Sequence, residues 1–207
     1  MNVLVVAATE LEIAPFQRLN KTNEVLITGV GVAATIYHLT RRLISAKYDL
    51  VIQAGIAGTF NRSLEMASVV IVKKDTFGDA GIVEKESYTT LFEAGLAKND
   101  PPFKDGWLYN THPLINNSSL KAVTAITVNT ISDNSAQTKR YIEKFSPDIE
   151  SMEGAGLHFT CLQEKVPFIQ LRSISNLVGT RDKSQWHIKD AIYNLCDELE
   201  TLLNSVK

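Results

Sequence analysis

Short apolar runs that end in polar or glycine-containing turns most strongly constrain how this 207-residue chain can fold. Residues 3–8, 25–28 and 50–54 form three such runs, each almost continuously apolar. This pattern is typical of strands that are covered on both faces, and such strands need helices on either side of their sheet. Further strands are predicted over residues 68–72, 122–128 and 168–175.

The spacing of apolar residues predicts helices between these strands. Apolar side chains recur three or four positions apart in residues 32–45, in residues 153–164, and from about residue 186 to near the end of the chain. Strands and helices therefore alternate along the sequence. The predicted fold is a single α/β domain over residues 1–207, with a mixed, mostly parallel central sheet flanked by helices.

One long segment interrupts this alternation. Residues 75–119 are rich in glycine, proline and asparagine, and only residues 89–96 in this segment favour a helix. A segment of this length inside an α/β domain is predicted to be an insertion that shapes a site or an interface.

Composition excludes several classes of function. The chain has 21 Lys and Arg residues against 23 Asp and Glu residues, so it lacks the basic surface that nucleic-acid binding requires. No apolar run approaches the ~20 residues of a membrane span, and the apolar start is too short for a signal sequence. Cys161 and Cys196 fit apolar helical patterns and are predicted to be buried free thiols. These features favour a cytoplasmic protein without nucleic-acid or membrane partners.

Cofactor motifs are incomplete. Gly29-x-Gly31-x-x-Ala34 has the spacing of a dinucleotide fingerprint, but Asp49 stands at the beginning of the next strand, whereas the acid of that fingerprint stands at its end. The four histidines have no neighbouring ligands at metal-site spacing, and no phosphate-loop or Gly-x-Ser-x-Gly motif is present. We therefore expect no metal and no organic cofactor.

Two acids and an amide follow predicted strands. Glu12 comes after the first strand, Glu153 precedes a predicted helix, and Asn176 ends the strand over residues 168–175. Each has an ordinary explanation as a helix-start acid or a turn residue. Together they predict a site, because open α/β sheets bind ligands at the carboxyl ends of their strands.

These residues, in this order, resemble the superfamily of purine nucleoside phosphorylases and nucleosidases. The resemblance covers most of the chain and is weakest over residues 75–119. It is carried by residues 5–12, the glycine turns at 27–31 and 53–58, the Met-Glu motif at 151–153, and the strand end at 172–176. Within the superfamily, residues 150–155 and 175–182 are most similar to the futalosine hydrolases, which remove hypoxanthine from futalosine in the alternative menaquinone pathway.

The resemblance implies a role for each candidate residue. The two catalytic candidates are Glu12, which would activate the attacking water, and Asn176, which would stabilise the departing base. The substrate-binding candidates are Gly55, Ile56, Ile131, Ser132, Met152, Glu153 and Arg181. Of these, Glu153 and Met152 would hold the ribose, and Arg181 would either pair with a carboxylate on the 5' side of the substrate or be a surface charge.

Three positions distinguish between members of the superfamily. Phosphorylases tend to carry an arginine and a hydroxyl residue where this chain has Gln53 and Ile56, so water is favoured over phosphate as the nucleophile. Adenine-specific nucleosidases carry an aspartate at the position of Asn176. An amide can donate hydrogen bonds to the N7 and O6 acceptors of a 6-oxopurine, which an ionised aspartate would repel.

Other functions stay open. The chain could be a methylthioadenosine/S-adenosylhomocysteine nucleosidase, a 6-oxopurine nucleoside phosphorylase, or a nucleoside-binding protein without catalytic activity. The resemblance also implies a homo-oligomer, either a dimer or a hexamer, in which a neighbour's loop closes the pocket. Residues 101–103 together with Trp107 are the candidate for that loop.

Overall fold

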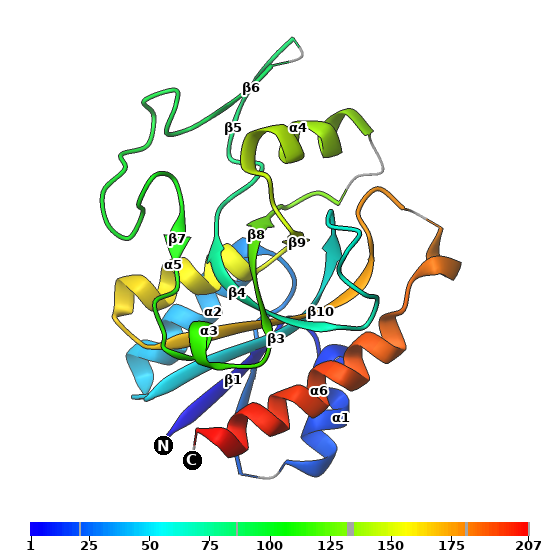
Figure 1. Cartoon of the computed structure of the whole chain (residues 1–207). Helices are drawn as coiled ribbons and strands as arrows, with labels where there is room; N and C mark the ends of the chain where they lie inside the picture. Colours follow the sequence, from blue (N-terminus) through cyan, green and yellow to red (C-terminus); the bar gives the residue numbers. More distant parts are fainter. Residues whose placement is uncertain (21, 86, 132–134, 181, 207) are drawn as a thin grey trace.

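A computed structural model describes residues 1–20, 22–85, 87–131, 135–180 and 182–206, and its centre is a mixed sheet (Figure 1). Along the sheet the strand order is β10-β4-β8-β9-β3-β1-β2, with β7 paired to β4. The strands are β1 (Val3–Ala7), β2 (Glu24–Ile27), β3 (Leu50–Thr59), β4 (Val69–Asp75), β7 (Leu108–Tyr109), β8 (Lys121–Thr127), β9 (Ile149–Ser151) and β10 (Phe168–Leu177).

Strand β3 organises the sheet. It pairs in parallel with β1 and β10 and antiparallel with β9, so the strands from β3 through β10, β4, β8 and β9 close into a ring. The β10–β4, β3–β9 and β4–β7 pairs are antiparallel, and the remaining pairs within the sheet are parallel. The mixed, mostly parallel α/β sheet predicted from the sequence is confirmed.

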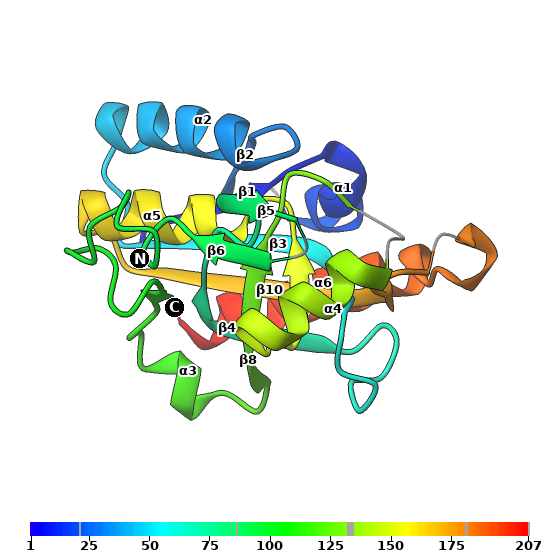
Figure 2. The same ribbon diagram turned by 90° about the horizontal axis from the view of Figure 1, so that it is seen from above.

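Helices cover both faces of the open part of the sheet, as the buried strands require. The helices are α1 (Glu10–Leu19), α2 (Val32–Ser45), α3 (Leu114–Asn117), α4 (Ser135–Phe145), α5 (Gly154–Glu164) and α6 (Ile188–Ser205). Figure 2 shows α2 and α5 on one side of the sheet and α6 on the other.

The side chains of β1 alternate between two apolar clusters, one on each face of the sheet. Val3 and Val5 pack with α1 and α6, whereas Leu4 and Val6 pack with α2 and α5. Both cysteines are buried free thiols, as predicted. None of the helices in the described ranges is long and apolar enough to cross a membrane.

The insertion over residues 75–119 differs from the sequence prediction. Residues 89–96 do not form a helix. Strands β5 (Gly81–Glu84) and β6 (Ser87–Thr90) pair as a separate two-stranded sheet, and turns follow through residue 95. Tyr88 and the two following threonines favour strand geometry, and the neighbouring β5 supplies the hydrogen bonds.

Candidate active site

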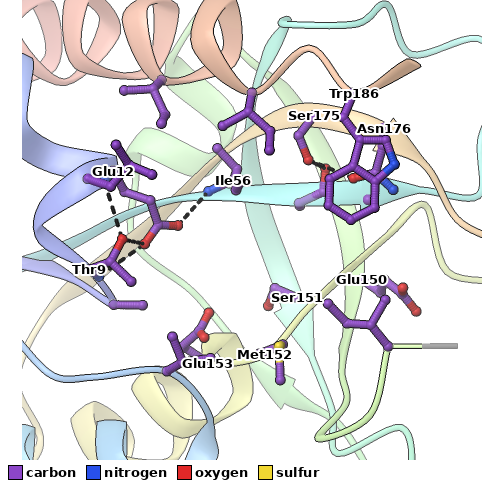
Figure 3. Close-up of a pocket in the computed structure, with 18 of the residues that line it drawn as sticks. Thr9, Glu12, Ile56, Glu150, Ser151, Met152, Glu153, Ser175, Asn176 and Trp186 are labelled. Atoms are coloured by element: carbon purple, nitrogen blue, oxygen red, sulfur yellow. Dashed lines mark hydrogen bonds between the residues drawn. The ribbon is translucent and has the colours of Figure 1, made fainter. Parts of the chain in front are cut away.

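A pocket of about 260 Å³ lies toward the carboxyl ends of β1, β3 and β10, where the sequence predicts a site. Figure 3 shows Glu12 and Glu153 toward one end of this pocket and Asn176 and Glu150 toward the other. Most of the candidate residues line it, namely Glu12, Ile56, Ile131, Met152, Glu153 and Asn176. Ser132 and Arg181 lie outside the described residues.

Backbone and hydroxyl groups hold the Glu12 carboxylate in place. Thr9 caps helix α1, and its N–H and Oγ1 donate to Oε2 of Glu12 at 3.1 and 3.0 Å. From β3, the N–H of Ile56 donates to Oε1 at 3.2 Å. Burial raises the pKa of Glu12 above its ordinary value of 4.5, an effect that the positive charge of Arg172 opposes. A fixed carboxylate with a raised pKa is suited to accept a proton from water.

The first glycine turn positions the second acid. The N–H of Gly31 donates to Oε1 of Glu153 at 3.1 Å, and Arg172 Nη1 donates to Oε2 at 3.4 Å. The turn that resembles a dinucleotide fingerprint therefore holds the Glu153 carboxylate in place through a backbone N–H. Asp49, the acid of that fingerprint, accepts instead from the N–H of Asn2 at 2.7 Å.

Arg172 joins the two acids from behind the pocket wall, a position that sequence reasoning missed. Its side chain is 1% exposed, and it donates to Gln53 Oε1 at 2.8 Å and to the carbonyl oxygen of Ile56 at 3.3 Å. Gly55 makes room for it, since a Cβ at that position would overlap Arg172 Nη1. Gly55 and Gln53 thus lie behind the lining residues, and Ile56 faces the pocket.

Asn176 follows an irregularity in β10. The register between β10 and β3 shifts between Ile174 and Asn176, which is the pattern of a β-bulge, and bulges commonly redirect side chains near active sites. Ser175 Oγ donates to Oδ1 of Asn176 at 2.8 Å, and Asn176 Nδ2 donates to the carbonyl oxygen of Leu177 at 2.9 Å. One amide N–H of Asn176 is thereby used within the strand, and the other is available to a ligand.

Glu150 is a further acid that sequence reasoning did not select. It lines the pocket from β9, and burial raises the pKa of its carboxyl to about 7. Trp186, from the segment before α6, also lines the pocket, and its Nε1 donates to the carbonyl oxygen of Thr180 at 2.9 Å. Glu150 and Met152 are two positions apart, a spacing that puts side chains on one face of an extended chain, but β9 has only three residues and was not predicted as a strand.

Acidic side chains outnumber cations at the pocket wall, since Arg172, which pairs with Glu153 from behind it, is set against three glutamates. Glu12, Glu150 and Glu153 all line it, and the lining residues that the structure describes include no lysine or arginine. Across the described ranges, no group of three or more His, Cys, Asp or Glu side chains is arranged to hold a metal ion. This arrangement favours a neutral nucleophile and a substrate that develops positive charge.

A family model described as the phosphorylase superfamily matches residues 16–206. The chain belongs to this superfamily. As a phosphorylase superfamily member it is similar in sequence to a futalosine hydrolase of Streptomyces coelicolor, with 28% identity over 162 residues that make up 75% of this chain. The matched region is 65% of that relative's length. A futalosine hydrolase of Thermus thermophilus is 25% identical over 86% of this chain and 80% of that relative.

Solved structures share the fold of this chain over nearly its whole length. A Helicobacter pylori methylthioadenosine nucleosidase mutant, with 5'-methylthioadenosine in its active site, matches with a TM-score of 0.82 and 16% identity over 99% of this chain and 98% of that one. This likeness is one of fold. Together, the family match and the hydrolases among the relatives support nucleoside hydrolase chemistry for this chain.

Proposed function

We propose that this protein hydrolyses the N-glycosidic bond of futalosine and releases hypoxanthine, a step of the alternative menaquinone pathway. One observation carries the proposal. A single pocket has Glu12 and Glu153 at one end and the Asn176 amide at the other, with Met152 between them (Figure 3). Two acids at one end fit the ribose and the attacking water, and an amide at the other end fits a purine. The names of the relatives support futalosine as the substrate.

The acids would act at the sugar. Cleavage of the bond between C1' and the base develops positive charge on the ribose ring, as in other glycosyl transfers. Glu153, fixed by Gly31 and Arg172, would accept hydrogen bonds from the ribose hydroxyls, while Met152 packs against the sugar. Glu12 would orient water toward C1' and take its proton as the new C–O bond forms.

Asn176 would act at the base. The electron pair of the broken bond passes to the purine, and the available N–H of Asn176 would donate to O6 or N7 as negative charge builds up there. Because Ser175 Oγ donates to Oδ1 and Leu177 takes one N–H, the second N–H of the amide is the group that would serve the base. An amide cannot act as a general acid, so the proton that the base finally takes up would come from water.

Electrostatics favour water over phosphate as the nucleophile. A phosphate dianion entering this pocket would meet three acidic side chains, and Arg172 is already bonded to Glu153, Gln53 and Ile56. Ile56 also offers no hydroxyl donor. These features support a hydrolase and disfavour a phosphorylase of inosine.

Replacing Asn176 by aspartate is expected to change which base is released. The carboxylate would repel O6 of hypoxanthine, so the ratio of hypoxanthine to adenine released from matched nucleosides should fall by about tenfold or more. Chromatography of the free base measures this ratio. Asn116→Asp, at an exposed position on α3, is the control and should leave the ratio unchanged. An unchanged ratio in Asn176→Asp would contradict the role of Asn176 and the proposed base.

A methylthioadenosine/S-adenosylhomocysteine nucleosidase is the second candidate, since solved enzymes of that name share this fold, as a Helicobacter pylori futalosine hydrolase also does. Asn176 disfavours it.

The homo-oligomer implied by the resemblance also stays a proposal. Phe103 of the candidate loop packs against Phe92 with ring centroids 5.0 Å apart, and Lys74 lies 4.0 Å from the Trp107 ring centre, so both aromatic side chains are packed within their own chain.

A further inference from the structure

Glu153 begins helix α5 but does not cap it. It is the N-cap residue of this helix (Figure 3), yet its side chain caps none of the N–H groups that the structure describes there. Its carboxylate is held instead by the N–H of Gly31 and by Arg172, at the pocket wall. An acid at an N-cap can otherwise accept from the first N–H groups of its own helix, which carry partial positive charge. Another group must therefore satisfy the start of α5.

Two hydroxyl groups provide the caps of α5. Ser151 Oγ accepts from the N–H of Gly154 at 3.3 Å, and Thr127 Oγ1, from strand β8, accepts from the N–H of Ala155 at 2.7 Å. Thr127 is fully buried and is not among the described residues that line the pocket. The shorter of the two caps thus comes from outside the site.

Asp75 fixes the direction of the Thr127 hydroxyl. Thr127 Oγ1 donates to Oδ1 of Asp75 at 3.0 Å, and the N–H of Thr76 donates to the same oxygen at 2.8 Å. A hydroxyl has one proton, so a group that gives it to Asp75 can only accept from Ala155. Asp75 is fully buried at the end of β4. Its carboxylate thereby makes Thr127 an acceptor for the helix.

Asp75 lies directly beneath the first residue of α5. A Cβ on Gly154 would overlap Asp75 Oδ2 and Gln170 Nε2, so both side chains lie against this glycine. Gln170 and Arg172 are two positions apart on β10 and share one face of the strand. Burial raises the pKa of Asp75 to about 6, a rise that the positive charge of Arg172 opposes. At neutral pH Asp75 is therefore mainly a carboxylate, the form that accepts the Thr127 proton.

We propose that Asp75 is a positioning residue for ribose binding: through Thr127 it caps helix α5 in place of Glu153, and so leaves the Glu153 carboxylate directed at the sugar hydroxyls. This inference rests on the proposed function, in which Glu153 binds the ribose. Without the Thr127 acceptor, the N–H of Ala155 would be buried and unpaired, a cost that Glu153 would remove by turning toward its own helix. That turn would take the carboxylate away from the ribose.

The preference for ribose over 2'-deoxyribose tests this role. Purified variants would be assayed with futalosine and its 2'-deoxy analogue, and the ratio of the two kcat/KM values compared with that of the wild type. The intrinsic difference in stability between the two glycosidic bonds cancels, because only changes in the ratio are used. Glu153→Ala removes the acceptor for the 2'-hydroxyl and should lower the ratio by about tenfold or more, which sets the scale.

Substitutions behind the pocket should lower the same ratio. Thr127→Val removes the hydroxyl and nearly keeps the shape of the side chain, so its ratio should fall most of the way toward that of Glu153→Ala. Thr127→Ser keeps the hydroxyl and should retain the wild-type ratio. In Asp75→Asn the neutral amide oxygen accepts the Thr127 proton more weakly, so the ratio should fall by about threefold. Thr124→Val, the same substitution on the same strand, is the control and should leave the ratio unchanged.

The outcomes separate this role from the proposed function. A wild-type ratio in Thr127→Val, Asp75→Asn or Glu153→Ala would overturn the role of Asp75 while leaving hypoxanthine release intact. An equal fall in Thr124→Val and Thr127→Val would also overturn it, because the effect would then be a general disturbance of β8. No release of base from futalosine by the wild type would contradict the proposed function itself, and this role with it. If Thr127→Val does not fold, as monitored by thermal melting, Asp75→Asn decides.

Discussion

Glu12→Gln is expected to lower kcat by about 10²–10⁴-fold, the usual contribution of a general base, while nucleoside binding changes little. Glutamine cannot take the proton of the attacking water. The variant also loses one acceptor for the Thr9 and Ile56 donors, so thermal melting should accompany the kinetics. Rates of base release and binding of the intact nucleoside are the two measurements required.

The matched control lies on the same helix. Glu10 is exposed in the first turn of α1, so Glu10→Gln should leave kcat unchanged. The pH profile gives a second check. Because the pKa of Glu12 is raised, the wild-type rate should fall at low pH with a midpoint above 4.5, and this limb should be absent in Glu12→Gln. Full activity of Glu12→Gln would remove Glu12 from the mechanism.

Arg172→Met is expected to produce the largest loss of stability, about 3–5 kcal/mol at neutral pH. The substitution leaves Glu153 without its ion-pair partner and Glu12 without the positive charge that opposes its pKa rise. Both carboxyls are buried. Lowering the pH should reduce the destabilisation, because protonation of Glu12, whose pKa burial already raises, removes one of the charges that Arg172 opposes. Urea unfolding at pH 7 and pH 5 measures both effects.

A surface ion pair provides the comparison for Arg172. Arg42 pairs with Glu24, and both side chains are partly open to solvent at 34% and 41% exposure. Arg42→Met should therefore destabilise the protein much less and with little dependence on pH. If the two arginine variants lost the same stability at neutral pH, the view that Arg172 neutralises the buried acids would be wrong.

Strands covered on two faces and helices with clear apolar stripes could be predicted from the sequence. Helix α2 has the predicted bounds, and β1, β2 and α5 lie within one or two residues of them. Strand β3 extends five residues beyond the predicted apolar run. This extension supplies Ile56 and Gly58 to the pocket. It became clear only from the structure, in which these residues pair with β10 and β9.

The missed elements lack such patterns. Helix α1 contains Pro15, which argues against a helix, and its signal was the capping box formed by Thr9 and Glu12. Helix α4 buries only Tyr141 among its described residues, and β9 has three residues. The hairpin of β5 and β6 stands apart from the main sheet, so no core face imposes a pattern on it.

The candidate site was predictable where short motifs carry it and not where distant pairings do. Glu12, Met152, Glu153 and Asn176 belong to local motifs that the resemblance covers. Arg172 acquires its position from Gln53, 119 residues away, and from Glu153, 19 residues away. Glu150 lines the same pocket as Asn176 because both pair with Gly58 of β3. Contacts of this kind follow from the fold.

Base release in phosphate-free buffer tests the central claim most directly. The purified protein would be incubated with futalosine, inosine, methylthioadenosine and S-adenosylhomocysteine, and the free base followed by chromatography. The account predicts hypoxanthine from futalosine without added phosphate, and little adenine from the other two purine thionucleosides. Base release that depends on phosphate, or preferential release of adenine, would contradict it.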